Sequence, residues 1–237
     1  MCGRFVVARA NSELLPLFDI DEAGDDLPVP SYNIAPTQMI SVVVDSGKDG
    51  VPHRRLAAAR WGLVAPFHKS LADGPTPFNA RVEKLVSSPL YRGPFARRRA
   101  IIPASGFYER RRGDRQSFYI HPDDDSVLAF AGLYEWWRDP TRSDDDPARW
   151  LLSATIVTHP PQATMVSIHD REPLYLDPTL WADWLDPATP GDETLLADVQ
   201  AASTAIAEAL EYRRIGPAWL STAAASRKDN PSLIASS

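Results

Sequence analysis

The sequence has only one cysteine, Cys2, so it cannot form an internal disulfide framework. It has no uninterrupted apolar stretch of the ~18 residues that a membrane-spanning helix needs. Its first residues also lack the basic segment followed by an apolar run that marks a signal peptide. A single cysteine argues for a reducing compartment. We therefore expect a cytoplasmic protein with no membrane contact.

Motifs for metals and cofactors are missing as well. No set of Cys, His and acidic residues has the spacing of a metal site, and there is neither a GxGxxG nor a GxxxxGK[ST] phosphate loop. We therefore expect no metal and no cofactor. The formal net charge of −6 disfavours bulk, non-specific binding of nucleic acid. Arginine, the residue best suited to bidentate contact with phosphate, nevertheless clusters at 97–99 and 110–112.

The apolar pattern predicts strands in the first and middle parts of the chain and helices late. The expected strands are 3–7, 39–44, 53–61, 99–102, 107–110, 118–121, 127–131 and 150–158, and the expected helical pieces are 13–18, 82–86, 90–95, 180–185 and 195–210. Residues 62–78 contain three prolines and predict a long, functional loop. Residues 211–237 predict an irregular tail. We expect one α+β domain over residues 1–237 with a curved antiparallel sheet and flanking helices, ending in about five loose residues.

Cys2 directly follows the initiator Met1. Because the side chain of Cys2 is small, we expect Met1 to be removed in the cell. Removal leaves Cys2 with an α-amine and a thiol, whose reference pKa values of about 7.7–8.0 and about 8.5 give a reactive fraction of each near neutral pH. Groups so placed condense with an aldehyde: the amine forms an imine, and the thiol then closes a five-membered thiazolidine. The alternative is that Cys2 is a small, buried apolar residue.

Several other polar motifs have ordinary explanations when each is taken alone. Asn79 is able to cap a following helix, and Glu109 to pair with one of several arginines. Asp170 and Arg171 would form a turn ion pair of little energetic value. For Glu135 we expect a solvated position at the end of a strand.

Taken as a set, these residues supply what a cysteine nucleophile needs. Glu109 and His169 are candidates for moving protons. Asn79 offers an amide that would stabilise a developing negative charge. Three arginines close in sequence to these groups are candidates for holding a substrate: Arg4, Arg81 and Arg171.

Six motifs in one order give the sequence a recognisable pattern. They are 1–5 (Met-Cys-Gly-Arg-Phe), 32–36 (Tyr-Asn-Ile-Ala-Pro), 60–63 (Arg-Trp-Gly-Leu), 79–83 (Asn-Ala-Arg-Val-Glu), 106–109 (Gly-Phe-Tyr-Glu) and 169–173 (His-Asp-Arg-Glu-Pro). With them the chain resembles the SRAP family, the SOS response-associated peptidases or abasic-site processing proteins. The resemblance extends from Cys2 to about Leu233.

The resemblance implies that the protein shields abasic sites in single-stranded DNA by a covalent crosslink through Cys2. Cys2 would also be the nucleophile of an autocatalytic removal of Met1. In this family pattern Asn79 matches the active-site amide, Glu109 the acid/base carboxylate and His169 the catalytic histidine. The implied DNA contacts are the phosphate-binding Arg4, Arg81 and Arg171, with Asn33 and Pro36 on the same face. The family fold is α+β, built on a strongly bent, barrel-like antiparallel sheet. We expect a monomer that joins the nucleoid when bound to DNA.

The chain departs from the family pattern in two places. Members often carry a tryptophan wedge after the Trp-Gly-x-x-Pro region, and here Phe67 stands in its place, where it would stack on bases. Residues 218–222 replace a Pro-Val-Ser turn, so the resemblance implies no DNA contact from that segment.

The mechanism that follows begins when Glu109 or His169 moves the protons that open the abasic sugar to its aldehyde. The Cys2 amine then forms the imine, and its thiol, steadied by Asn79, closes the ring. The main rival is an N-terminal-nucleophile amidohydrolase, which also begins Met-Cys-Gly. This chain continues Arg-Phe, however, and contains no Asn-Gly oxyanion element. A peptidase acting on other proteins and a non-catalytic single-strand binder remain open alternatives.

Overall fold

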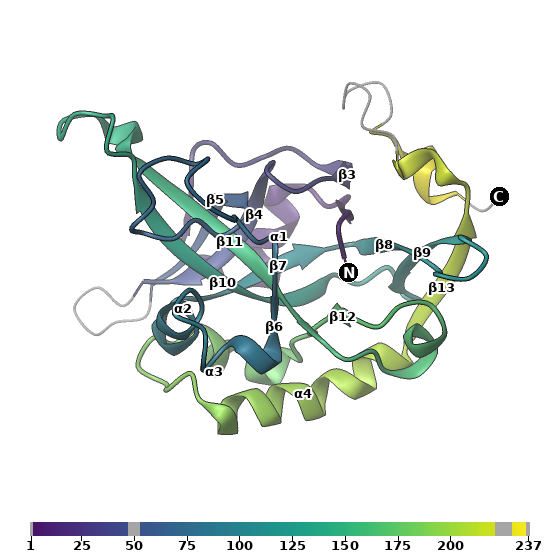
Figure 1. Ribbon diagram of the computed structural model, residues 1–237. Helices are drawn as coiled ribbons and strands as arrows, with labels where there is room; N and C mark the ends of the chain where they lie inside the picture. The colour runs from purple at the N-terminus through teal and green to yellow at the C-terminus, as the bar shows by residue number, and fades with distance from the viewer. Residues whose placement is uncertain (1, 47–52, 221–228, 236–237) are drawn as a thin grey trace.

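A closed barrel of five strands occupies the centre of the structure, a computed structural model that describes residues 2–46, 53–220 and 229–235 (Figure 1). The strands are β4 (Met39–Asp45), β5 (Arg54–Trp61), β7 (Arg99–Ala104), β10 (Leu128–Arg138) and β11 (Trp150–His159). Around the ring β11, β10, β7, β4 and β5 pair antiparallel. A parallel contact of β5 with β11, Ser153 with Arg60 and Ala154 with Trp61, closes it. The prediction of an α+β fold on a strongly bent, barrel-like sheet is confirmed.

Three short strands extend the barrel at its edges. β6 (Asn79–Arg81) runs parallel to β11 just beyond the closing contact, and β12 (Glu172–Pro173) pairs antiparallel with the end of β11. β2 (Glu22–Ala23) lies parallel to β5. The 62–78 loop therefore leaves the barrel at the end of β5, which pairs with β11. It returns as β6, which pairs with β11 as well.

A second antiparallel sheet carries the start of the chain. Its order is β13 (Leu210–Ile215), β9 (Ser117–Pro122), β8 (Gly106–Arg110), β1 (Phe5–Val7) and β3 (Ser31–Ile34). Phe5 packs edge-on against Trp61, with ring centroids 5.0 Å apart, and against Phe130 at 6.2 Å. These contacts join β1 to the barrel, so the residues just before β1 lie where the two sheets meet.

The prediction of an irregular tail from residue 211 is wrong for its first residues, which form β13. β13 pairs with β9 over six residue pairs, from Leu210 with Pro122 to Ile215 with Ser117. The strand was missed because it lies at the sheet edge, where Glu211 and Arg214 are exposed and mask the buried Leu210 and Ile215. Further on, Leu233 is buried in a small second core with Val6, Tyr108, Tyr119, Ile215 and Trp219. Residues 236–237 of the expected loose tail lie outside the described residues.

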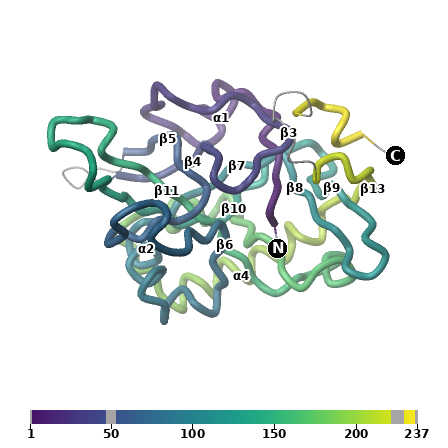
Figure 2. Tube along the Cα trace, turned by 45° about the horizontal axis from the view of Figure 1, so that its top comes forward, coloured from purple at the N-terminus to yellow at the C-terminus, as the bar shows by residue number. Residues whose placement is uncertain are grey.

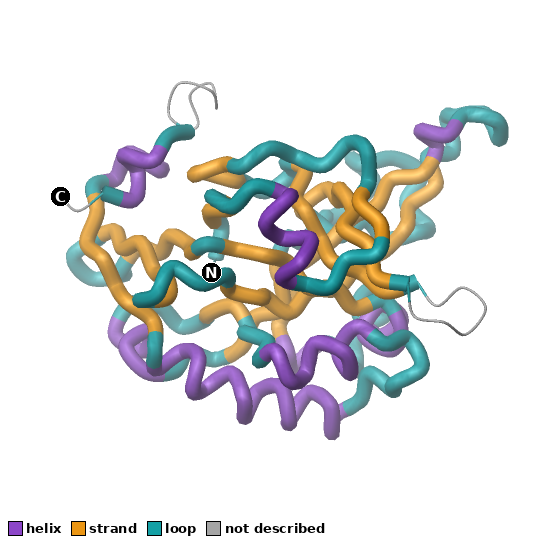
Figure 3. Tube along the Cα trace, turned by 180° about the vertical axis from the view of Figure 1, so that it is seen from behind, coloured by secondary structure: helices purple, strands orange, loops and turns teal. Residues whose placement is uncertain are grey.

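The α-helices are α1 (Asn11–Leu17), α2 (Arg92–Arg97), α3 (Trp181–Leu185) and α4 (Glu193–Glu208), and 3-10 turns include Val82–Lys84, Ala163–Ser167 and Pro217–Leu220. α2, α3 and α4 lie on one side of the barrel, where α4 forms the long helix of Figure 3, and α1 lies away from them (Figure 1). α4 begins after Asp192, whose carboxylate accepts from the N–H groups of Thr194 and Leu195. No helix in the described part of the chain is long and apolar enough to cross a membrane.

Arg99, fully buried at the start of β7, fastens two of these helices to the barrel. Its guanidinium donates to the carbonyls of Phe95 and Ala96 in α2, both at 2.9 Å. It also donates to the carbonyl of Trp184 in α3, at 2.6 Å, and to those of Asp186 and Thr189 beyond that helix. A cation suits the carbonyl ends of helices, where the helix dipole is negative.

We expect Arg99→Met to destabilise the protein by about 3–5 kcal/mol, because it leaves several buried carbonyls without their charged donor. Urea unfolding would measure the loss. Arg97→Met, at the exposed neighbouring position in α2, is the matched control and should change stability by no more than about 0.5 kcal/mol. Equal effects of the two substitutions would contradict the anchoring role of Arg99.

Candidate functional site

Cys2 is fully buried at the meeting point of the two sheets. In Figure 2 the chain start runs from β1 toward β6. There the Asn79 side-chain N–H donates to the main-chain carbonyl of Cys2 at 2.9 Å. Asn79 is itself held by the pairing of β6 with Ile156 of β11. The alternative role of Asn79 as a helix cap does not hold, because the N-cap of the 3-10 turn Val82–Lys84 is Arg81. The amide instead fixes the backbone of Cys2.

Burial changes the chemistry of the Cys2 thiol. The pKa of the thiol is raised far above its usual value, first by loss of hydration and second by the negative charge of Glu109. The thiol thus stays protonated at neutral pH, unlike the free thiol assumed from the sequence. The sulfur needs a base before it acts as a nucleophile.

Glu109 acts electrostatically on this thiol and on His169, and buried Tyr175 also interacts with the thiol. Glu109 is buried on β8, and His169 is mostly buried in the loop before β12. Burial lowers the pKa of His169, and the charge of Glu109 opposes that effect. Glu109 acts on the pKa of both Cys2 and His169, so its carboxylate lies within electrostatic reach of each of them. The structure thus brings together Cys2, Asn79, Glu109 and His169 from four separate segments.

The loop 160–171 that carries His169 is closed at its base by two buried groups. His159 of β11 pairs with Glu172 of β12, and their side chains approach to 3.5 Å. The Glu172 carboxyl also accepts the main-chain N–H of Gln162 at 2.7 Å. Burial raises the pKa of Glu172 to about 8 and lowers that of His159 to about 4. Both groups are therefore largely uncharged at neutral pH.

Arg4 and Asn33, two predicted DNA contacts, meet each other and the C-terminal segment. The Arg4 guanidinium donates to the Asn33 side-chain oxygen at 2.9 Å, and both residues donate to the Trp219 carbonyl, at 3.3 and 3.2 Å. The Trp219 ring stacks on Tyr108, with centroids 5.2 Å apart. Sequence reasoning missed Trp219, because nothing local indicates that residue 219 returns to β1 and β3.

The other predicted DNA contacts lie on exposed or half-exposed segments. Arg81 is exposed at the end of β6, and Arg171 pairs with Glu83 at 2.7 Å. Phe67 is 73% exposed in the 62–78 loop. Pro36 lies in a turn whose next residue, Thr37, donates its main-chain N–H to the carbonyl of Trp61, where that loop begins.

The expectation of a solvated Glu135 is wrong. β10 continues to Arg138, so Glu135 lies within the strand opposite Ser153. Its carboxylate is buried and pairs with Arg98 at 2.7 Å. The sequence prediction ended this strand too early, at residue 131.

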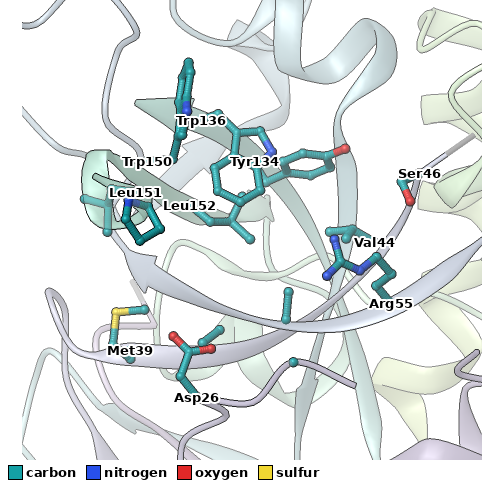
Figure 4. A pocket seen from close by; sticks show the side chains of 14 residues that line it. Asp26, Met39, Val44, Ser46, Arg55, Tyr134, Trp136, Trp150, Leu151 and Leu152 are labelled. Atoms are coloured by element: carbon teal, nitrogen blue, oxygen red, sulfur yellow. The ribbon is translucent and has the colours of Figure 1, made fainter. Parts of the chain in front are cut away.

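Two cavities lie at different distances from the site. One of about 750 Å³ opens between the β10–β11 hairpin and β4–β5, and Tyr134, Trp136 and Trp150 line it (Figure 4). It lies at the start of β11, whereas Asn79 pairs near the other end, so it is remote from Cys2. A second cavity of about 430 Å³ is lined by His169 itself. Within the described ranges no group of three or more Cys, His, Asp or Glu side chains is arranged to hold a metal ion.

Comparison with known proteins agrees with the sequence resemblance. A family model described as SOS response associated peptidase (SRAP) matches residues 1–218. The chain is 37% identical over 191 residues to the abasic site processing protein YoqW of Bacillus subtilis (strain 168), covering 79% of this chain and 81% of that protein. It is 30% identical over 199 residues to the abasic site processing protein YedK of Escherichia coli (strain K12), covering 81% and 83%.

The fold has a close counterpart among solved structures. A crystal structure of a protein from Bacteroides thetaiotaomicron superposes with a TM-score of 0.80 at 17% sequence identity, covering 100% of both chains. At that identity the likeness concerns the fold alone.

The buried carboxyl of Glu172 predicts a loss of stability as pH rises. Its pKa is higher in the folded protein than in the unfolded chain, so its favourable contribution is complete below the unfolded pKa of about 4.3. That contribution is lost as pH rises through the folded pKa of about 8. Glu172→Gln keeps an oxygen acceptor for Gln162 but cannot ionise. We therefore expect the difference in melting temperature between Glu172→Gln and the wild type to shift by several degrees in favour of Glu172→Gln when the pH is raised from 5 to 8.

Thermal unfolding of both proteins at each pH would measure this difference. Glu208→Gln, at an exposed position of α4, is the control and should track the wild type. A constant difference between Glu172→Gln and wild type across the range would mean that Glu172 is ionised throughout.

Proposed function

Since this chain belongs to the SOS response-associated peptidase (SRAP) family, we propose that it processes abasic sites in single-stranded DNA by forming a covalent crosslink through Cys2. The names of its relatives, abasic site processing proteins, support the substrate. The observation that carries the proposal is that Cys2, bonded through its carbonyl to Asn79, lies within electrostatic reach of Glu109, which also acts on His169. Removal of Met1, which exposes the α-amine of Cys2, is the first step.

The α-amine begins the reaction with DNA. Asn79 holds the Cys2 carbonyl, and its own side-chain oxygen is buried and accepts no hydrogen bond from the described residues. That oxygen is an acceptor for the N–H of the amine, which it would orient toward C1′ of the opened sugar. Attack forms the N–C bond, and loss of water gives the imine.

Proton transfer is assigned to Glu109 and His169. Opening the sugar ring requires a proton to leave the C1′ hydroxyl and another to reach the ring oxygen. Loss of water from the carbinolamine requires a third transfer. The lowered pKa of His169 favours its neutral, basic form near neutral pH, and a carboxylate at Glu109 complements it as the partner acid or base.

The thiol closes the ring in the last step. It loses its proton to the nearby Glu109, the sulfur bonds to C1′, and the π electrons of the C=N bond move to nitrogen. The nitrogen takes up a proton and becomes the ring amine. Because the buried thiol is protonated at rest, we assign the first attack to the amine and the second to the sulfur.

The DNA strand is held by the residues around this pocket. Arg81 and Arg171 are assigned to phosphates next to the abasic sugar, and Phe67 to stacking on a flanking base. Arg4 and Asn33, with Pro36, form the rim on the β3 side. An exposed Phe67 and an exposed Arg81 support these roles.

Crosslinking should require both groups of Cys2, in different steps. Protein that retains Met1 has no free amine on Cys2 and should form no adduct with an abasic oligonucleotide. Cys2→Ser with Met1 removed should form mainly an open imine, trapped by borohydride and released by heat, because oxygen adds to the imine less readily than sulfur. Trimmed wild type should give a heat-stable adduct. Intact-mass analysis distinguishes the three forms.

An adduct from Met1-retaining protein would overturn the thiazolidine mechanism. Glutamine hydrolysis that depends on Cys2, with no DNA adduct under any condition, would instead favour an amidohydrolase.

Glu109→Gln should slow crosslinking by roughly 100- to 10,000-fold, the usual contribution of a positioned acid or base. Affinity for DNA should be almost unchanged, since the amide fills the same space. Gel-shift assays would measure affinity, and time courses of adduct formation the rate. Glu211→Gln, exposed on β13, is the control. A normal crosslinking rate for Glu109→Gln would mean that His169, and not Glu109, transfers the protons.

A further inference from the structure

Arg112, Asp170 and His169 form a chain of charged contacts beside the site. One carboxylate oxygen of Asp170 lies 2.9 Å from Nδ1 of His169 and 2.8 Å from the guanidinium of Arg112. Arg112 comes from the turn between β8 and β9, and the other two residues come from the loop 160–171. A single oxygen thus divides its negative charge between a histidine at the site and an arginine at the surface.

Nδ1 of His169 has two neighbours that favour opposite protonation states. The main-chain N–H of Arg171 points to Nδ1 at 3.2 Å, which requires a lone pair there and hence a neutral ring. The Asp170 carboxylate favours a proton on the same nitrogen. Which state prevails depends on how much of the Asp170 charge Arg112 neutralises.

The pair between Arg112 and Asp170 is easily exchanged. Their side chains are 65% and 56% exposed, and ion pairs so exposed contribute little to stability. The neighbouring Arg111 differs, because its guanidinium makes two hydrogen bonds to Asp114 and lies over the ring of Phe118. Of the two arginines that line the cavity next to this turn, Arg112 is therefore the one whose present partner is held weakly.

The cavity of about 430 Å³ lies between this turn and the His169 loop. Arg111, Arg112 and Gly113 line one side, and Val166, Ser167, His169 and Asp170 line the other. Its volume falls within the range of about 300–1,000 Å³ that is usual for ligand sites. An arginine at its mouth and an exposed Val166 match a phosphate group and the apolar face of a sugar.

We propose that this cavity binds a backbone phosphate of the DNA strand next to the abasic site, and that Arg112 leaves Asp170 to hold it. Asp170 then directs its full charge to His169 and favours the protonated imidazole. DNA binding would thus change His169 from a base to an acid. The inference rests on the proposed function, which supplies the strand; the comparisons and the motifs do not assign Arg112.

The direction in which the pKa of His169 changes follows from the charged groups around it. Burial is the largest effect and lowers the pKa of His169; Glu109 of β8 raises it, the positive charge at the amino end lowers it, Asp170 raises it, and Arg112 lowers it. A phosphate that neutralises Arg112 removes the effect by which Arg112 lowers the pKa of His169. It also strengthens the effect by which Asp170 raises that pKa. The pKa of His169 must therefore rise when the phosphate binds.

Binding of an unmodified single-stranded oligonucleotide tests the phosphate contact without any crosslinking. Arg112→Ala should make the slope of log K against log salt less steep by about 0.7, the value for one phosphate on a single strand. Arg112→Lys, which keeps the charge, should restore most of that slope. Arg142→Ala is the matched control: it removes another exposed arginine paired with acids, in the loop between β10 and β11, and should leave the slope unchanged.

NMR titration of the His169 ring tests the coupling. In wild type, saturating unmodified DNA should raise the pKa of His169. In Arg112→Ala the pKa should already be higher without DNA, and DNA should raise it less. A merely structural Arg112 would leave both values as in wild type, and that result would overturn the coupling.

The outcomes separate this inference from the function on which it rests. Normal crosslinking by Arg112→Ala, together with an unchanged salt slope and an unchanged His169 response, overturns the inference and leaves the crosslinking function intact. Failure of the wild type to bind single-stranded DNA or to form an adduct overturns both.

Discussion

The short parallel contact between β5 and β11 is the constraint on which the site depends. It closes the barrel with two residue pairs, after which Gly62, at φ +135, turns the chain away and donates its N–H to Ala154. A side chain is strained in that conformation, and a Cβ would also lie 3.1 Å from the carbonyl of Thr76. The carbonyl of Phe78 then accepts from both the Trp61 indole and the N–H of Ile156. These bonds return the chain to β11 as β6 and so place Asn79 against Cys2.

Burial determines how the site behaves at rest. Loss of hydration keeps the Cys2 thiol protonated, His169 and His159 neutral, and the Glu172 carboxyl protonated near neutral pH. An enclosed thiol that is not ionised is poorly reactive toward oxidants and stray electrophiles.

The sequence predicted the local pieces of this structure better than its long-range pairings. Cys2, Asn79, Glu109 and His169 were identified because each stands in a motif whose residue types suit one chemical task, and the structure brings the four together. Closure of the barrel was outside the reach of local patterns, because strand pairing depends on residues far apart in the chain. β13 and Glu135 were missed because both carry polar residues that local patterns assign to the surface. Only pairing with distant segments shows that β13 is an edge strand and that Glu135 forms a buried ion pair. Trp219 gave no local signal, and Arg112 stood out only as part of the arginine run 110–112.

The position of β1 inside the second sheet has a consequence for synthesis on the ribosome. Phe5 pairs with Phe107, so β1 cannot dock until roughly 100 further residues have been made, which takes about 5–20 s at usual rates of translation. During that interval the nascent amino end is open to any aminopeptidase that travels with the ribosome. After docking, the side chain of Cys2 is enclosed. Docking of β1 therefore sets the time at which access to Cys2 from outside ends, and the speed of translation sets how long the amino end stays open before it.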